Sequence, residues 1–259
     1  MLGKLIRYEI PALGRKLVPL YIGWAATAVV LGIMVGPLAG KSEFLMVISA
    51  MLYAGVATAI FVMAVILIVQ RYKNSLLGDE GYFAHTLPVT ASEHIASKAV
   101  AALVWVLLSG VALMLTGLLI AVFSGSIKDL FSLDWGLFFQ DIFEHFDLKA
   151  AVMIVELIIV GALSITKSIM QIYTALTIGH QAKDRPSIAS IGAYIGLMVA
   201  ESFLGRLLMA VIPDNVLMNF STRGGFMIGM LVAAVIMMAI SAVYFFICRY
   251  LMETRLDLN

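Results

Sequence analysis

The chain has 259 residues, of which 62% are hydrophobic and 13% are charged. Soluble domains carry about 25% charged residues, so this composition excludes an ordinary water-soluble domain and indicates a protein whose main solvent is lipid. The formal net charge of +1 identifies no partner. The single cysteine, Cys248, excludes an internal disulfide framework and is expected to be a small packing residue.

At the start of the chain, residues 1–16 set apolar side chains among basic ones. This pattern is typical of a helix that lies in the membrane interface, and Pro11 is expected to break that helix or restart it. A positively charged flank of the first span explains the same charges equally well.

Six stretches are long and apolar enough to cross a bilayer, which takes about 20 residues in a helix. The sequence therefore predicts an all-α integral membrane protein of six transmembrane helices in a single transmembrane domain. Two polar segments stand out between the spans, 71–98 and the acidic, aromatic 124–149. The predicted spans are about 17–38, 45–70, 99–123, 150–178, 188–212 and 226–248.

The lysine and arginine residues predict the orientation of these spans. Eleven of them fall on the side that carries both termini and segment 71–98, five fall on the other side, and Lys167 lies inside the fourth span. Because cytoplasmic loops carry the excess of Lys and Arg, we expect both termini in the cytoplasm. Segment 124–149 is then an outer loop.

Motifs for nucleotide binding and for hydrolysis are missing from the sequence. The run Gly36–Ser42 resembles a nucleotide-binding P-loop, but it has three residues between its glycines where the motif needs four. No zinc-protease motif and no nucleophile elbow occur. His145 lies among acids in the outer loop, and a solvated loop explains it better than a metal site. We therefore expect no enzymatic activity, no cofactor, no metal and no nucleic-acid partner for this chain.

Pairs of glycines four residues apart let helix backbones approach closely in membranes. Packing within one chain explains them, and packing between two chains is the alternative for the first and fifth spans. The pairs are Gly32 with Gly36, Gly192 with Gly196, and Gly225 with Gly229.

Three charged residues stand out inside the predicted spans, where each charge costs about 2.5–3.5 kcal/mol by insertion scales. Glu156 and Lys167 share a face of the fourth span but lie about 16 Å apart, too far to pair directly. Gln171 continues this polar face, and Glu201 lies in the fifth span. The face either lines a polar cavity or packs against another span. These four residues are the candidate transport pathway.

Segment 71–98 combines turn residues with apolar side chains that are unusual in a free loop. Pro88 disfavours helix before it, and Ser92 with Glu93 predicts the start of the next helix. The apolar side chains must pack against the protein's own helix ends or against a partner. They are Leu76, Leu77, Tyr82, Phe83 and Leu87.

The order of elements around this segment resembles the membrane subunits of type-2 ABC exporters. A basic N-terminal segment and a second span ending in Arg-Tyr-Lys precede the run Leu-Gly-Asp-Glu-Gly-Tyr at 77–82. Thr-Leu-Pro-Val-Thr at 86–90 follows, and Ser97-Lys98 opens the third span. The resemblance covers the six-span layout, and its specific wording is confined to about 71–98.

The resemblance implies that segment 71–98 carries a coupling helix, which docks on a separate ATP-binding cassette subunit. ATP and Mg²⁺ would bind that subunit, whose movement would pass through the loop to the first, second and fifth spans. A second permease subunit, identical or related, would complete the path. The implied docking residues are Leu76, Leu77, Asp79, Glu80, Tyr82, Phe83 and Leu87.

The family also implies a bacterial cell membrane, an amphipathic substrate and short re-entrant helices at 201–220. Shifted helix boundaries would place Glu201 and Arg206 in such an element before Pro213. Export of a peptide, an antibiotic or a lipid-like molecule is the expected function.

Three other functions remain open. An ion-coupled secondary transporter would use Glu156, Glu201 and Lys167, although the halves 1–123 and 124–259 show no internal repeat of the kind common in that class. A non-transporting immunity or sensor subunit would have the same docking loop. An intramembrane enzyme would need a nucleophile–base or metal pattern, which the sequence lacks.

Overall fold

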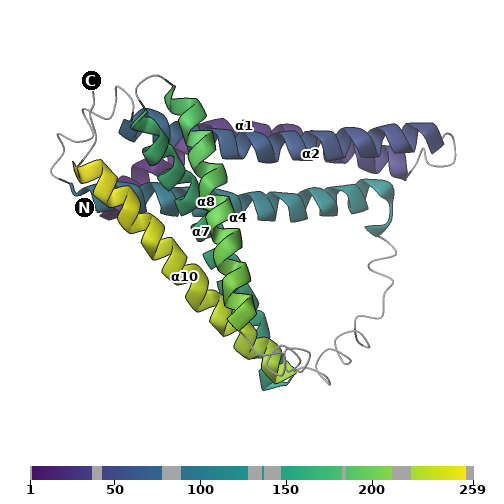
Figure 1. The fold of residues 1–259 in the computed structure, drawn as a ribbon. Coiled ribbons are helices and arrows are strands. Elements are labelled where there is room, and N and C mark those ends of the chain that lie inside the picture. The colour runs from purple at the N-terminus through teal and green to yellow at the C-terminus, as the bar shows by residue number, and fades with distance from the viewer. Residues whose placement is uncertain are drawn as a thin grey trace. The chain divides into compact units, whose positions relative to one another are not determined.

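The computed structural model describes residues 2–36, 43–77, 89–127, 136, 147–182, 185–211 and 223–254. Within these ranges the regular structure is entirely helical, and six helices are long and apolar enough to cross a membrane (Figure 1). The predicted fold class, an all-α membrane protein with six spanning helices, is confirmed.

Each predicted span overlaps one observed helix, and most of the helices extend beyond the predicted apolar core. All of the long helices except Pro186–Val211 have 30 residues or more, whereas a bilayer requires roughly 20. The polar ends of these helices therefore reach the membrane interfaces or extend beyond them. The second helix continues into a short π-helix, η1. The elements are α1 (Leu2–Val35), α2 (Glu43–Tyr72), η1 (Lys73–Leu77), α4 (Ala91–Ser124), α7 (Leu148–His180), α8 (Pro186–Val211) and α10 (Arg223–Thr254).

Helix α1 runs unbroken through Pro11 and Pro19, so the expected break at Pro11 is wrong. A proline removes one backbone hydrogen bond from a helix but does not have to end it when packing holds the flanking turns. Leu13 and Leu17 are buried on the turns after Pro11, and the Trp105 Nε1 donates a 2.9 Å hydrogen bond to the Ile10 carbonyl. The expected interfacial segment and first span are thus one continuous helix.

The chain forms two compact units. One unit comprises Arg7–Ile68 and Val104–Asp147, which hold most of α1 and α2 and the later part of α4. The other unit comprises Met1–Ile6, Val69–Leu103 and Leu148–Asn259, which hold η1, the start of α4, and all of α7, α8 and α10. We call them the α1/α2/α4 unit and the α7/α8/α10 unit.

In the α1/α2/α4 unit, aromatic side chains with polar tips join the helices. The Tyr21 hydroxyl lies 2.6 Å from the Ser109 Oγ, linking α1 with α4. The Tyr53 hydroxyl lies 2.9 Å from the Thr116 Oγ1, linking α2 with α4. Trp24 stacks on Tyr53, with ring centroids 6.2 Å apart. Hydroxyl pairs of this kind satisfy polar groups that lipid cannot.

In the α7/α8/α10 unit, α7 packs against both other helices (Figure 1). The Thr174 Oγ1 donates to the Tyr244 carbonyl at 3.0 Å, and one turn later Thr177 meets Cys248, so α7 and α10 run in the same direction. Gly179 faces Ser190 so closely that a Cβ would collide with its backbone. Helix α8 therefore returns antiparallel along α7.

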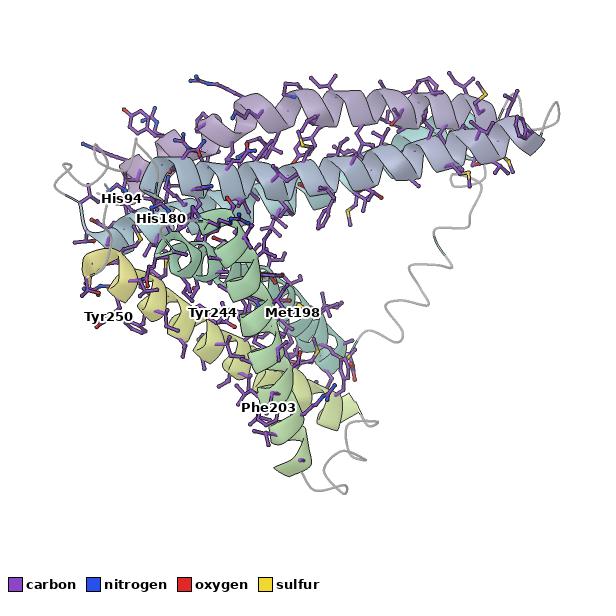
Figure 2. The ribbon with its side chains drawn as sticks, turned by 45° about the horizontal axis from the view of Figure 1, so that its top comes forward. His94, His180, Met198, Phe203, Tyr244 and Tyr250 are labelled. Carbon is purple, nitrogen blue, oxygen red and sulfur yellow. The ribbon has the colours of Figure 1, made fainter. Side chains whose placement is uncertain are left out.

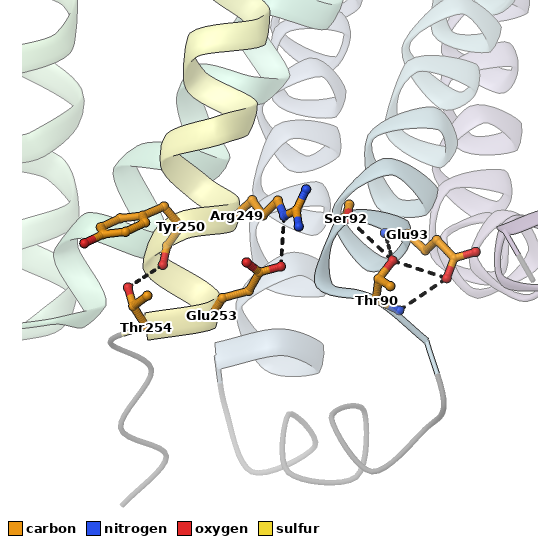
Figure 3. Close-up of polar contacts among 7 residues, drawn as sticks. All are labelled: Thr90, Ser92, Glu93, Arg249, Tyr250, Glu253 and Thr254. Atoms are coloured by element: carbon orange, nitrogen blue, oxygen red, sulfur yellow. Dashed lines mark hydrogen bonds and ion pairs between the residues drawn. The ribbon is translucent and has the colours of Figure 1, made fainter.

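Helix α4 begins with a capping box at Thr90 (Figure 3). The Glu93 backbone N–H donates to the Thr90 Oγ1 at 3.4 Å, and the Thr90 N–H donates to the Glu93 Oε2 at 3.2 Å. The predicted helix start at Ser92 and Glu93 is therefore close to the observed one, but Thr90 supplies the cap. At the same end of the unit, Arg249 pairs with Glu253 near the end of α10.

The proposed re-entrant element at 201–220 is wrong for its first part. Glu201 and Arg206 belong to the continuous helix α8, which ends at Val211. The run that follows Glu201 contains no proline before Pro213, so nothing interrupts the helix earlier. Residues 212–220 lie outside the described part of the chain.

Candidate functional site

A charged cluster joins all three helices of the α7/α8/α10 unit. The Lys167 Nζ lies 2.7 Å from the Glu201 Oε2, and the Tyr244 hydroxyl donates to the Glu201 Oε1 at 2.7 Å. Figure 2 labels Tyr244 on α10. The lysine and glutamate side chains are 20% and 18% exposed. We call these three residues the Lys167–Glu201–Tyr244 cluster.

The antiparallel course of α7 and α8 explains why the cluster forms. Gly179 meets Ser190 near the turn between the helices, and the same register carried along both helices places Lys167 opposite Glu201. An ion pair inside a span removes most of the cost of two separate charges, and the tyrosine hydroxyl satisfies the second carboxylate oxygen. The positive charge of Lys167 and the negative charge of Glu201 balance, and the contacts of the cluster join α7, α8 and α10.

Sequence reasoning identified Lys167 and Glu201 as separate charges and missed Tyr244. Nothing in the sequence distinguishes Tyr244 from the other aromatic residues of the last span. Its role depends on the parallel packing of α7 and α10, which is a tertiary feature.

The other two candidate pathway residues lie apart from this cluster. Glu156 is 8% exposed, and its Oε2 is enclosed without a hydrogen-bond partner. Gln171 is 4% exposed, and its Nε2 is likewise enclosed and unpartnered. The polar face of α7 is therefore packed inside the unit over much of its length, and the four residues do not converge on one point.

A second polar cluster lies at the end of the unit that carries η1. Tyr72 is fully buried and stacks on Tyr173, with ring centroids 3.9 Å apart and an angle of 12° between the rings. Its hydroxyl lies 2.9 Å from the Thr177 Oγ1 and 2.9 Å from the Cys248 Sγ. We call Tyr72, Tyr173, Thr177 and Cys248 the Tyr72 clamp.

The Tyr72 clamp also holds the far end of segment 71–98. The Tyr173 hydroxyl donates to the Lys98 carbonyl at 3.3 Å, so one side chain of α7 contacts both the end of α2 and the start of α4. Lys98 itself is 4% exposed. Sequence reasoning missed this cluster because its four members come from three separate helices.

The residues expected to dock a partner are only partly described. Leu76 is fully buried in η1, which packs on α7, so in this structure it serves the chain's own packing. Leu77 ends η1, and its side chain lies outside the description. The other expected docking residues also lie outside the described part: Asp79, Glu80, Tyr82, Phe83 and Leu87.

The glycine pairs occupy different surroundings. A Cβ on Gly32 would lie 2.7 Å from the Phe123 Cβ, and one on Gly36 would collide with the Ser124 backbone, so this pair seats α1 on α4. A Cβ on Gly192 or Gly196 would meet nothing within 4 Å. Gly225 and Gly229 are half-buried in the first turns of α10.

No group of three or more metal-ligating side chains occurs among the described residues. Comparison of the chain with protein-family models, with curated proteins and with solved structures finds no match.

Proposed function

We propose that this chain is the permease subunit of an ATP-driven exporter, and that segment 71–98 receives the movement of a separate ATP-binding subunit. The resemblance of this segment to type-2 ABC exporters suggests the class. The observation that supports it best is the Tyr72 clamp, because a loop that transmits movement must be tied to the helices that move.

The two ends of segment 71–98 are tied to the same helix. Tyr72, at the end of α2, stacks on Tyr173 of α7 and reaches Cys248 of α10. Lys98, in the third turn of α4, accepts the Tyr173 hydroxyl through its carbonyl. A displacement of the intervening residues is therefore delivered to α7 and α10 through buried contacts, which resist compression.

The remaining parts of the proposal follow from the family and from the distribution of charge. ATP and Mg²⁺ bind the partner subunit, and a second permease subunit, identical or related, completes the path. The excess of Lys and Arg on one side supports cytoplasmic termini, and the family resemblance supports a bacterial cell membrane. The substrate is amphipathic, and the chain itself performs no covalent chemistry.

Affinity purification of the tagged chain from its native membrane tests this proposal. After crosslinking and extraction in mild detergent, mass spectrometry should identify an ATP-binding cassette subunit with the wild type. Asp79→Lys/Glu80→Lys should lose it, whereas Glu253→Lys, a charge reversal on an exposed acid of α10, should retain it. Failure to recover any ATP-binding subunit with the crosslinked wild type contradicts the proposal.

An ion-coupled secondary transporter is the second candidate, favoured by the ion pair of Lys167 and Glu201 inside the spanning helices. In that case transport by the purified chain in vesicles should follow an ion gradient without ATP. A non-transporting sensor subunit would recover the ATP-binding subunit but move no substrate.

A further inference from the structure

We propose that three basic residues of α1, Arg7, Arg15 and Lys16, bind the phosphate groups of anionic phospholipids in preference to zwitterionic ones. We call these residues the α1 basic patch. The inference concerns the lipid around the chain, so it goes beyond the proposed function and does not depend on an ATP-binding partner. It is supported by the way α4 holds this part of α1 and by the surface that α1 leaves exposed.

Helix α4 holds the early turns of α1 from one side. The Trp105 Nε1 donates a 2.9 Å hydrogen bond to the Ile10 carbonyl, and a Cβ on Gly14 would lie 2.6 Å from the Trp105 ring. Leu13 and Leu17 are buried on the same side of the helix. These turns are therefore packed on α4 as part of a spanning helix, which keeps the charges of the α1 basic patch at a constant depth.

The surface of α1 that Trp105 does not cover has a basic part and an apolar part. Arg7, Arg15 and Lys16 are exposed, and Val18 and Ile22, which follow them, are 45% and 66% exposed. Exposed apolar side chains on a spanning helix face the acyl chains of the lipid. Because Val18 follows Arg15 by only about 4.5 Å along the axis, Arg15 and Lys16 lie at the level of the lipid headgroups.

The charge on this surface is positive. Glu9 is the only acid in α1, and it is only partly exposed. It precedes Arg15 by about one and two-thirds turns, which places it on another side of the helix. Arg15 and Lys16 thus present two neighbouring cations to the headgroups, and Arg7 adds a third about 12 Å further from the apolar part. Each basic residue near an anionic membrane surface strengthens the attraction by about fivefold.

The chemistry of the α1 basic patch selects a phospholipid with net negative charge. The guanidinium group of Arg15 can hold a phosphate through two parallel hydrogen bonds, and Lys16 adds a positive point charge. A zwitterionic headgroup carries a cation of its own, which these two side chains repel. Tyr8, which is 77% exposed beside Arg7, has the apolar ring and polar tip that are typical of the membrane interface.

The test titrates the purified full chain in detergent with equal amounts of phosphatidylglycerol and phosphatidylcholine that have identical acyl chains. Native mass spectrometry measures the ratio of the two bound lipids, which should favour phosphatidylglycerol by about fivefold or more in the wild type. Arg15→Gln/Lys16→Gln should bring this ratio close to one. The control Lys149→Gln/Arg185→Gln removes two exposed basic charges near the starts of α7 and α8, and it should keep the ratio of the wild type.

A ratio near one in the wild type overturns the inference without any variant. An unchanged ratio in folded Arg15→Gln/Lys16→Gln also overturns it, as does an equal loss in the control, which would show a general attraction to basic charge. If the double variant does not fold, the single variant Arg15→Gln should still lower the ratio. Displacement of phosphatidylglycerol by an equal concentration of glycerol 3-phosphate overturns the inference too, because the patch would then bind a soluble phosphate.

Discussion

Tyr72 stacks face to face on Tyr173, with their ring centroids 3.9 Å apart. This contact brings the end of α2 onto α7, and the hydroxyl of Tyr173 reaches on to the carbonyl of Lys98 at the start of α4. The segment between Tyr72 and Lys98 is therefore anchored at both ends by one side chain. The account of the protein as a coupled membrane subunit depends on this anchor.

Replacing Tyr72 should loosen the clamp in two steps. Tyr72→Phe keeps the stacked ring but removes the hydroxyl that meets Thr177 and Cys248, at a cost of about 1 kcal/mol. Tyr72→Ala also empties the aromatic site and should cost about 3–5 kcal/mol. Thermal unfolding of the purified protein measures both.

Cys248 provides an internal reporter of the same clamp, because it is the only cysteine and is fully buried. Alkylation of Cys248 by a maleimide should be slow in the wild type and faster in Tyr72→Ala. Tyr8→Ala, at an exposed tyrosine of α1, is the matched control and should leave the rate unchanged. Equal alkylation rates in Tyr72→Ala and wild type would show that Tyr72 does not close this site.

Removing only one charge of the intramembrane ion pair between Lys167 and Glu201 should lower the stability of the protein more than removing both charges. Lys167→Met leaves the Glu201 carboxylate without its cation and should destabilise the protein by about 3–5 kcal/mol. Lys167→Met/Glu201→Gln removes both charges and should recover much of the loss. A double-mutant cycle measured by thermal unfolding isolates the coupling between the two residues.

If the stability lost in Lys167→Met/Glu201→Gln equals the sum of the losses in Lys167→Met and Glu201→Gln, the two residues are not coupled and do not act as an ion pair. Tyr244→Phe is the companion variant, since it removes only the hydrogen bond to the Glu201 carboxylate. It should cost about 1.5–3 kcal/mol in the wild type and much less when Glu201 is already Gln.

Two of the three glycine pairs, Gly32 with Gly36 and Gly192 with Gly196, should respond differently to added side chains. Gly32→Val places atoms against Phe123 and Ile120 and should destabilise the protein by about 1–3 kcal/mol. Gly192→Ala meets open space and should stabilise the helix slightly, by up to about 1 kcal/mol. Thermal unfolding distinguishes them. Destabilisation by Gly192→Ala at low protein concentration would mean that this face is packed within the chain.

The cap at Thr90 should contribute to the stability of the start of α4. Thr90→Ala removes the side-chain acceptor of the Glu93 N–H and should cost about 1 kcal/mol. Ser92→Ala is the control, because among the described residues the Ser92 hydroxyl hydrogen-bonds only to the Thr90 hydroxyl. Hydrogen exchange of the first turn of α4 should rise with Thr90→Ala and stay near wild type with Ser92→Ala.

The helices were predictable from the sequence because a bilayer demands long apolar runs, and such runs are visible without tertiary information. Lys167 and Glu201 were also recognisable, since charges inside spans are rare. Their pairing was not, because it depends on the register of α7 against α8. The continuity of α1 through Pro11 likewise depends on contacts with α4, which no local pattern contains.

The Tyr72 clamp could not be predicted from the sequence, because it too depends on tertiary contacts. Tyr72, Tyr173 and Cys248 are separated by long stretches of chain and belong to residue types that are common in membrane helices. The start of α4 was easier to predict, although the cap is Thr90 and not Ser92, since either residue type can accept the hydrogen bond.

The most direct test of the coupling is the alkylation rate of Cys248 in inside-out native membrane vesicles, with and without ATP. The account predicts that ATP changes this rate in the wild type, because a movement received by segment 71–98 reaches Cys248 through Tyr72. The change should disappear in Asp79→Lys/Glu80→Lys. A rate in the wild type that is the same with and without ATP would contradict the account.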